Sequence, residues 1–232
     1  MDTDEDLAAR IAGVSVLADP VRRALYRFVA AQDEPVSRDQ AAAGTALPRH
    51  TAKFHLDRLV EEGLLDTEYR RLSGRRGPGA GRPAKLYRRS ARELDVSVPE
   101  RRYDAAGRVL ADAVTRSAAE EIPVMAAVEA AAADAGHRLA ASVPVPDGAD
   151  GPDRLVAVLA GCGYEPRVDG GSVVLANCPF HALARDHTAL VCGMNLHMLS
   201  ALVAELGCPD LQAVLDPAPG RCCVRVGPRA GG

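Results

Sequence analysis

The sequence has few aromatic side chains and no tryptophan, and this scarcity limits how it can bind nucleic acid. Aromatic residues make up 3 % of its 232 positions. Proteins that bind single strands usually stack the bases on aromatic rings, so single-strand binding is disfavoured. The sequence also has no apolar run approaching the roughly 20 residues that span a bilayer, and the opening MDTDED lacks the charge pattern of a signal peptide. We therefore expect a cytoplasmic protein with no membrane partner.

Net charge is low as well, but the charges are unevenly distributed. Lys and Arg number 28 and Asp and Glu number 31, which gives a formal charge of -3 and argues against a general polyanion binder. Residues 49–92 nevertheless contain twelve basic and five acidic side chains, a local charge of +7. A basic segment inside an acidic chain predicts that one surface of the protein meets a polyanion.

Helical signals dominate the first sixty or so residues. Asp19-Pro20 is typical of an N-cap followed by proline at the first helical position. Ser37 and Gln40 have the spacing of a capping box, and Pro48 opens a third helix. The predicted helices cover residues 20–32, 38–43 and 48–63.

A predicted β-hairpin follows these helices. The segments LLDTEYRRL and PAKLYRRS are strand-like, and the glycines and prolines of the intervening SGRRGPGAGR cannot continue a strand. We call this hairpin, residues 64–90, the wing. Helix, short helix, turn, helix and hairpin is the order of a winged helix-turn-helix, and the basic segment coincides with its third helix and wing. Residues 1–92 are therefore predicted to form a DNA-binding domain.

In a winged helix-turn-helix, the N-terminal half of the third helix enters the major groove, so its outward side chains are candidates for contact with bases or phosphates. Basic wing side chains can follow the wall of a groove, although a solvated basic loop would attract phosphate without reading sequence. The predicted DNA-contacting residues are Arg49, His50, Thr51 and Lys53 on the helix and Arg75, Arg76, Arg82 and Lys85 on the wing.

Two further regions follow the wing. Residues 93–148 contain a linker and an Ala-rich stretch that predicts one long helix or two helices interrupted near Pro123. Its small apolar side chains suit close helix packing, either across a homodimer or against the protein's own domain, and we expect a helical dimerisation region. Residues 149–232 alternate between helical and strand patterns and are predicted to form a small α+β ligand-binding sensor domain. The fold class is thus α+β.

The cysteines are the remaining candidate functional residues. Five of the six cysteines lie after residue 175, and in a reducing compartment those that matter should bind metal or react rather than form structural disulfides. Cys178 ends a predicted strand, Cys192 lies where a helix is expected to restart, and Cys222 begins the last predicted strand. A helix N-terminus favours the thiolate, which suits metal ligation. Cys223 is expected to point away from Cys222, because neighbours on a strand face opposite sides.

The spacing leaves several ligand sets open. Cys178 and His181 have a zinc-like Cys-x-x-His spacing, but no second pair of this kind accompanies them. One straight helix would hold His181 and Cys192 about 16 Å apart, so the helix must bend for both to bind one metal. Widely separated cysteines are also compatible with an iron–sulfur cluster. The candidate ligands are Cys178, Cys192 and Cys222, with the fourth position open to His181, His187, Cys223, an external thiol or water, while Cys162 and Cys208 are expected to be small buried hydrophobes.

Four segments carry a resemblance to a known family: GRPAKLYRRS, RRYDAAGRVLADAV, NCPFHALARDHTALVCGMNLHMLSALVAELG and LDPAPGRCCVRV. Together they resemble the winged-helix transcription regulators of the Suf iron–sulfur assembly operon and their actinobacterial relatives. The resemblance implies a dimeric DNA-binding protein in which Cys178, Cys192 and Cys222 hold a 4Fe–4S cluster. The C-terminal region also resembles the small-ligand domains of the 4-vinyl-reductase type, in which one cysteine precedes the long helix and another opens the last strand.

We therefore expect a homodimeric regulator that binds double-stranded promoter DNA as a repressor, with operator binding controlled by the cluster and with no small-molecule substrate. A zinc-stabilised winged-helix regulator that responds to another signal is the alternative. A Cys178–His181 or Cys192–His187 nucleophile pair would indicate an enzyme. No Gly-rich phosphate loop, paired carboxylates or third orienting group accompanies either pair, so we expect no enzymatic activity.

Replacing Arg75, Arg76 and Arg82 together with Ala tests the wing. Contacts with phosphates release counterions, so their loss should weaken binding to every duplex and flatten the dependence of affinity on salt concentration. Fluorescence anisotropy titrations of duplex DNA at several salt concentrations measure that slope. A slope equal to that of the wild type would show that the wing does not contribute to the interface.

Overall fold

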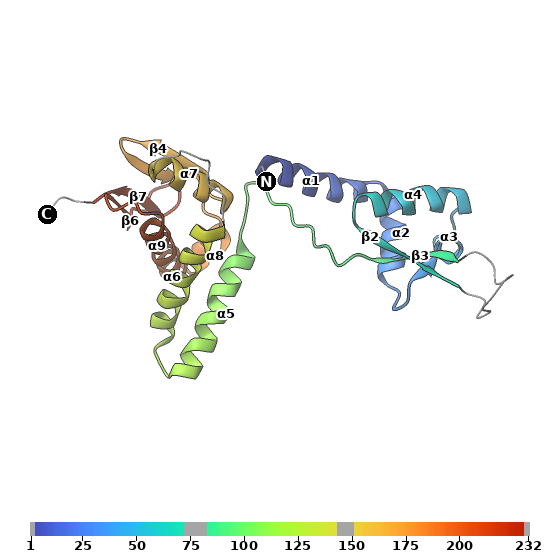
Figure 1. The fold of residues 1–232 in the computed structure, drawn as a ribbon, viewed down its shortest axis with the longest axis horizontal. Coiled ribbons are helices and arrows are strands. Elements are labelled where there is room, and N and C mark those ends of the chain that lie inside the picture. The colour runs from blue at the N-terminus through green and yellow to red at the C-terminus, as the bar shows by residue number, and fades with distance from the viewer. Residues whose placement is uncertain (1–2, 72–82, 143–150, 230–232) are drawn as a thin grey trace. The chain divides into compact units, whose positions relative to one another are not determined.

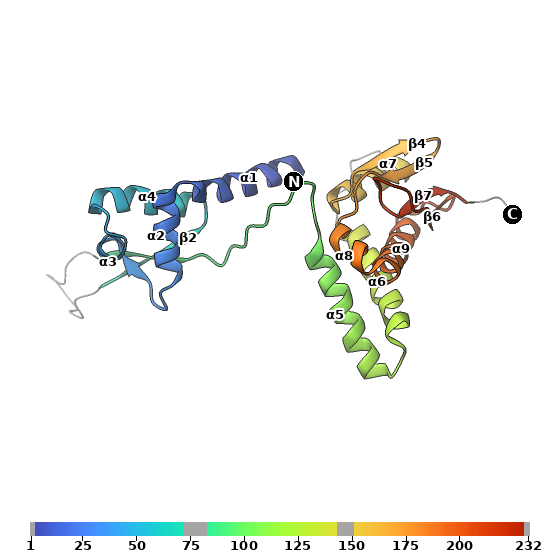
Figure 2. The same cartoon turned by 180° about the vertical axis from the view of Figure 1, so that it is seen from behind.

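Two compact units make up the protein, and the chain passes from one to the other between Val96 and Ser97. The structure is a computed structural model that describes residues 3–71, 83–142 and 151–229. Figure 1 and Figure 2 show its helices and strands from opposite sides. Each unit has its own buried apolar core, so each is described by itself.

The N-terminal unit combines helices with a small antiparallel sheet of strand order β1-β3-β2. Its elements are α1 (Thr3–Ser15), a 3-10 turn (Val16–Ala18), α2 (Pro20–Ala30), β1 (Val36–Ser37), α3 (Arg38–Gly44), α4 (Arg49–Glu61), β2 (Leu65–Arg70) and β3 (Ala84–Arg89). Helices α2, α3 and α4 are the three predicted helices, and β2 and β3 are the strands of the wing. The predicted order of helices and hairpin is therefore confirmed.

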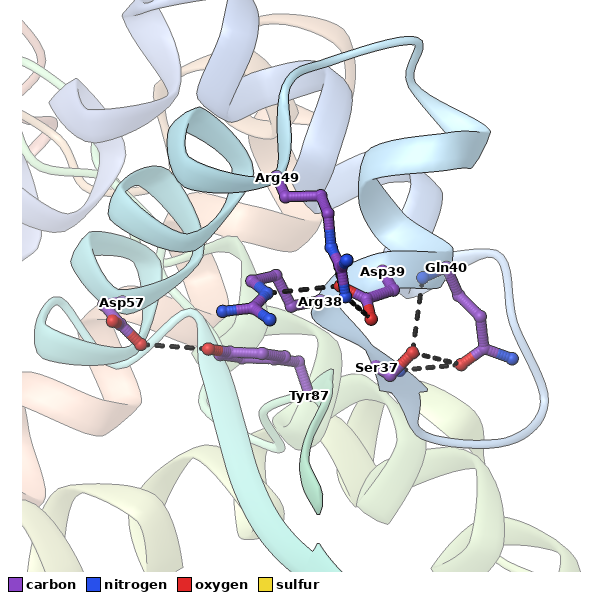
Figure 3. A network of polar contacts seen from close by, with 7 residues as sticks. All are labelled: Ser37, Arg38, Asp39, Gln40, Arg49, Asp57 and Tyr87. Carbon is purple, nitrogen blue, oxygen red and sulfur yellow. Dashed lines mark hydrogen bonds and ion pairs between the residues drawn. The ribbon is translucent and has the colours of Figure 1, made fainter. Parts of the chain in front are cut away.

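Capping side chains fix where α2 and α3 begin. The Asp19 carboxylate accepts hydrogen bonds from the backbone N–H groups of Val21 at 2.8 Å and Arg22 at 3.0 Å. Ser37 and Gln40 form a complete capping box, in which each side chain binds the backbone N–H of the other residue (Figure 3). An N-cap of this kind is worth about 1 kcal/mol. Both helix starts were predictable because the caps are local sequence signals.

The core of the N-terminal unit holds α4 by one face. Leu56 and Leu59 on α4 are fully buried and share this core with Leu25 on α2. Leu65 and Tyr87 close the core from the sheet. Burial of one leucine side chain contributes about 1.5–3 kcal/mol. Because the apolar face of α4 is anchored in this way, its opposite face is available to another molecule.

The C-terminal unit combines helices with a four-stranded antiparallel sheet of order β4-β5-β7-β6. Its elements are α5 (Tyr103–Glu120), α6 (Val124–Ser142), α7 (Gly151–Gly161), β4 (Pro166–Asp169), β5 (Ser172–Leu175), α8 (His181–Asp186), α9 (Thr188–Glu205), β6 (Leu211–Leu215) and β7 (Val224–Pro228). The mixture of helix and sheet agrees with the predicted α+β class. Strand β6 was not predicted, because the short segment LQAVL suits a helix as well as a strand.

The Ala-rich stretch forms two helices that pack within the C-terminal unit. The chain reverses between α5 and α6 at Glu121, which has a left-handed φ of 54°, just before Pro123. Helix α6 then lies along α9, as both ribbon views show, and its buried alanines belong to the same core (Figure 1, Figure 2). The sequence predicted that residues 93–148 form a separate linker and helical dimerisation region. Small side chains that suit a contact between two chains suit a close contact within one chain equally well.

Helix α9 is the most apolar element of this unit. In the described part of the chain it is the one helix long and apolar enough to cross a membrane. Its residues Met194, Leu199 and Leu202 are nevertheless buried in the core of the unit. Asn195 is buried among them and forms hydrogen bonds inside the unit. This pattern is typical of the core helix of a globular unit.

Gly136→Ala should destabilise the protein, because a methyl group at this position of α6 would collide with the backbone carbonyl of Met198 on α9. We expect a loss of about 1–3 kcal/mol in the free energy of unfolding, the usual cost of overpacking. Gly107→Ala is the matched control on α5, where an added methyl group meets nothing within 4 Å. That variant should be neutral or more stable by up to about 1 kcal/mol. Urea denaturation measures both, and equal effects would contradict the close packing of α6 on α9.

Candidate functional site

The outward face of α4 is the first candidate site. His50, Lys53 and Phe54 are exposed on this helix and Thr51 is half-buried, whereas Ala52 lies in the core. These side chains occupy the first half of the helix, where a recognition helix contacts base edges. The Phe54 side chain is 65 % exposed, so it is available to contact an apolar group such as a thymine methyl.

Arg49 forms an ion pair across the turn between α3 and α4. Its guanidinium donates two hydrogen bonds to the Asp39 carboxylate, one of them from Nε to Oδ1 at 2.6 Å (Figure 3). Asp39 also accepts a hydrogen bond from Arg38 at 3.3 Å. The Arg49 hydrogen bond, with support from Arg38, lowers the pKa of Asp39. Because the Arg49 side chain is 66 % exposed, the pair is well solvated, and a DNA phosphate can compete for the guanidinium.

Asp57 joins α4 to the wing. Its carboxylate accepts hydrogen bonds from Lys53 at 2.8 Å, from Lys85 at 2.7 Å and from the hydroxyl of Tyr87 at 3.0 Å, the last of which Figure 3 shows. Partial burial alone would raise the pKa of Asp57, but these hydrogen bonds lower it to about 2. Burial and the neighbouring carboxylate raise the pKa of Tyr87. One carboxylate therefore positions two of the lysines that are predicted to contact DNA.

A basic pocket of about 430 Å³ lies between the helix-turn-helix and the wing. Arg38, Lys53 and Lys85 line it together with Asp39. Its lining suits a phosphate group, and contacts of this kind position a protein on the duplex without reading its sequence. The other predicted wing residues, Arg75, Arg76 and Arg82, lie outside the described residues.

Four cysteines of the C-terminal unit converge, and they form the second candidate site. The thiols of Cys178 and Cys222 form a hydrogen bond, and the sulfur of Cys192 lies 2.6 Å from that of Cys223. Cys192 is also within electrostatic range of Cys178. Cys178 follows β5, Cys192 lies on α9, and the Cys222–Cys223 doublet immediately precedes β7. Three segments far apart in the sequence thus bring four thiols together.

Cys178, Cys192 and Cys222 differ in acidity. Hydrogen bonds from Cys222 and the Phe180 N–H lower the pKa of Cys178 to about 7, although burial opposes this shift. Burial, together with contact with Cys223, raises the pKa of Cys192 to about 12. The hydrogen bond with Cys178 and burial raise the pKa of Cys222. Of these three thiols, Cys178 therefore becomes a thiolate most readily.

The segment around Cys178 is held in place by a basic side chain. Arg101 donates a hydrogen bond to the Cys178 carbonyl oxygen at 2.8 Å. A pocket of about 230 Å³ opens beside Cys178, and its lining includes Arg101, His181 and Arg221. The positive charges of the two arginines favour negative charge in this pocket.

Two buried asparagines organise the same region, and sequence reasoning missed both. Asn195 on α9 donates a hydrogen bond from Nδ2 to the sulfur of Cys222 at 3.3 Å and accepts one from the hydroxyl of Tyr164. Asn177, next to Cys178 in the chain, accepts a hydrogen bond from the backbone N–H of Glu165 at 2.7 Å. A lone asparagine carries no sequence pattern of its own. For Asn195 the available signal was a polar residue in a mainly apolar helix.

Two expectations about the cysteines were wrong. The helical segment breaks at His187, whose φ of -134° and ψ of 52° are not helical, so Cys192 lies in the second turn of α9 rather than at a helix N-terminus. The Cys222–Cys223 doublet precedes β7 instead of beginning it, so the alternation of strand side chains does not apply to it. Both members of the doublet therefore contact cysteines of the group.

The other predicted sulfur and nitrogen candidates do not join this group. His181 and His187 are exposed, and in the described part of the chain no hydrogen bond joins either ring to a sulfur. Cys162 and Cys208 are buried in the apolar core, as expected for small hydrophobes. Among the described His, Cys, Asp and Glu side chains, no group of three or more is already arranged to hold a metal ion. The four converging thiols form two contacting pairs instead.

The comparisons with known proteins bear on the N-terminal unit. Residues 17–68 match a protein family described as a helix-turn-helix domain. The matched region begins in the 3-10 turn, ends within β2 and includes α3 and α4. No curated protein and no solved structure matches the chain significantly. The N-terminal unit therefore carries a DNA-binding domain of the kind found in transcription regulators.

Asp57→Asn tests the junction between α4 and the wing. The carboxylate has a pKa of about 2 in the folded protein against an ordinary 3.8, so it stabilises the fold above about pH 4 and loses this contribution as the pH falls through about 2. We expect the Asn variant to be less stable than the wild type near neutral pH. Between about pH 4 and pH 2 it should lose less further stability than the wild type does.

Urea denaturation at several pH values measures these stabilities. Tyr87→Phe is the companion variant, because it removes one of the three hydrogen-bond donors to Asp57 and keeps the ring. It should reduce the pH dependence by less than Asp57→Asn does. Identical pH profiles for the wild type and the Asn variant would mean that this carboxylate does not hold the wing to α4.

Proposed function

We propose that the protein is a homodimeric transcription repressor of the cytoplasm whose binding to promoter DNA depends on an iron–sulfur cluster held by the C-terminal cysteines. The convergence of Cys178, Cys192 and Cys222 in a chain that also carries a helix-turn-helix domain is the observation behind this proposal. The resemblance to regulators of the Suf operon supports the same reading. On this proposal the signal is the supply of iron–sulfur clusters or the redox state of the cell.

The N-terminal unit supports contact with double-stranded DNA. Its recognition helix α4 is anchored in the core by one face and presents basic and apolar side chains on the other. Lys53 and Lys85 are held near each other by Asp57, beside a pocket that suits a phosphate. Arg49 pairs with the exposed carboxylate of Asp39 on α3, and a phosphate can replace that partner.

The donor atoms of the cysteine group suit a cluster bound by thiolates. All four converging side chains end in sulfur, the ligand atom that iron–sulfur clusters use most. Cys178, with its pKa near 7, is readily deprotonated, and Arg101 and Arg221 line the pocket beside it and offset negative charge. When bound, such a cluster supplies sensitivity to iron supply and to oxidants.

The cysteine group is connected to the helices of the C-terminal unit through Cys192. Cys192 lies on α9, and α9 shares a core with α6, so a change in the position of Cys192 is transmitted to both helices. Val114 on α5 and Val124 and Met125 on α6 are exposed, and exposed apolar side chains of this kind support a contact between two copies of the chain. A dimer recognises an operator only when its two DNA-binding domains match the spacing of the half-sites.

DNA binding by the metal-free and the reconstituted protein tests the proposal. The full-length protein is reconstituted anaerobically with ferrous iron and sulfide, and a duplex is selected with it from a random pool. We expect its affinity for that duplex to exceed that of the metal-free protein by about 5–150-fold, the usual range for a coupling of 1–3 kcal/mol. Cys178→Ala should abolish the difference, whereas the matched control Cys162→Ala, at a buried thiol outside the group, should preserve it.

Two outcomes would count against the proposal. Equal affinity of the two forms for the selected duplex would contradict control by a cluster. A colourless protein that carries one zinc per chain and no sulfide after anaerobic purification would favour a zinc-stabilised regulator that responds to another signal.

A further inference from the structure

We propose that the C-terminal unit binds a small neutral molecule with an apolar body and one hydrogen-bond acceptor, such as an aryl ketone. The binding site is a pocket beside the N-terminal end of α5, and Arg102 lines it. This inference goes beyond the proposed function and holds whether or not the protein carries a cluster. It follows from the size of the pocket, its apolar lining and the donors of Arg102.

The size and lining of this pocket suit a molecule slightly larger than benzene. Its volume is about 210 Å³, and its lining comes from the C-terminal unit alone. The mainly apolar lining residues are Ala105 on α5, Leu139 on α6, Tyr164 after α7, Phe180 before α8 and Met198 on α9. An apolar cavity of about 150 Å³ binds benzene, so this pocket has room for a substituted benzene ring.

Arg102 provides hydrogen-bond donors for such a ligand. Its Nη2 group donates a hydrogen bond to the carbonyl oxygen of Gly161 at 3.1 Å and forms an ion pair with Glu100 at 2.9 Å. Among the described residues no acceptor binds its Nη1 group, and its Nε is buried without a hydrogen-bond partner. Because donors without an acceptor are unfavourable beside apolar side chains, this guanidinium favours a ligand that brings an acceptor.

The charges around the pocket favour a neutral ligand over an anion. The Glu100 carboxylate pairs with Arg102 and balances its positive charge. Burial raises the pKa of Cys162 to about 11, so this lining thiol is uncharged at neutral pH. The hydroxyl of Ser142 already donates a hydrogen bond to the carbonyl oxygen of Leu139 at 3.1 Å. A carboxylate on the ligand would place its charge near that of Glu100, whereas a ketone oxygen would not.

The pocket shares two of its lining residues with the surroundings of the cysteine group. The backbone N–H of Phe180 donates a hydrogen bond to Cys178. The hydroxyl of Tyr164 binds Asn195, whose amide binds the sulfur of Cys222. A bound ligand therefore contacts residues that hold cysteines in place. The pocket is thus positioned to connect a ligand signal to the cysteine group.

Methionine methyl signals in nuclear magnetic resonance spectra test for binding in the metal-free full-length protein. Met198 lines the pocket, whereas Met125 is exposed on α6 and lies outside the lining. With ¹³C-labelled methionine methyl groups, we expect acetophenone to shift the signal of Met198 until it saturates and to leave that of Met125 unchanged. Benzoate, which carries a negative charge on the same ring, should bind at least about fivefold more weakly.

Two variants assign the binding to the pocket and to Arg102. Ala105→Leu fills the pocket and should weaken acetophenone binding at least about tenfold, whereas the matched control Ala111→Leu, at an exposed position of α5, should stay within about twofold of the wild type. α-Methylstyrene has the shape of acetophenone but a methylene group in place of the oxygen. Arg102→Met should reduce the preference for acetophenone over α-methylstyrene at least about fivefold, because it removes the donors and keeps the apolar stem.

Each of these measurements can overturn the inference. A Met198 signal that acetophenone leaves unchanged, an Ala105→Leu variant that binds like the wild type, or tighter binding of benzoate than of acetophenone would do so. An unchanged ligand preference in Arg102→Met would also do so, since the donor would then lie elsewhere. If Arg102→Met does not fold, Arg102→Lys replaces it, and the titrations of the wild type need no variant. Iron and sulfide play no part in these experiments, so failure of the proposed function would leave this inference standing.

Discussion

Burial of α9 determines where the sulfur of Cys192 lies, and the cysteine group depends on that position. The helix packs against α6 through small side chains, and Gly136 leaves room for the backbone carbonyl of Met198. The same helix carries Asn195, whose amide binds the sulfur of Cys222. A shift of α9 would therefore separate Cys192 from Cys223 and break the bond to Cys222 together. The packing of α9 against α6, which involves no reactive side chain, thus holds the cysteines in place.

The N-terminal unit uses a related arrangement for its charges. Leu56 and Leu59 anchor α4, and the neighbouring Asp57 collects hydrogen bonds from α4 and from β3. The carboxylate reduces the net positive charge of this surface, but it orders the lysines before DNA arrives. Ordered side chains lose less conformational freedom when they bind, and preorganisation of this kind favours affinity.

Features set by interactions between neighbours in the sequence were predicted correctly, whereas features that depend on tertiary contacts were not. The starts of α2 and α3 were predictable because Asp19 and Ser37 cap the helices that immediately follow them. The packing partner of the Ala-rich helices was not, since small side chains suit contacts within and between chains. The contact of Cys223 with Cys192 was not predicted, because it depends on β7 beginning at Val224, directly after the doublet. The proximity of Cys178, Cys192 and Cys222 was expected from spacing and resemblance, but it is formed by tertiary contacts that no local pattern encodes.

The central claim is that four particular thiols are neighbours, and it can be tested without any metal. Mild oxidation of the metal-free native protein with diamide, followed by digestion without reductant and mass spectrometry, maps which cysteines lie within bonding reach. We predict links between Cys178 and Cys222 and between Cys192 and Cys223, with Cys162 and Cys208 left as free thiols. Links that mainly involve Cys162 or Cys208, or four thiols that resist oxidation to each other, would contradict the account.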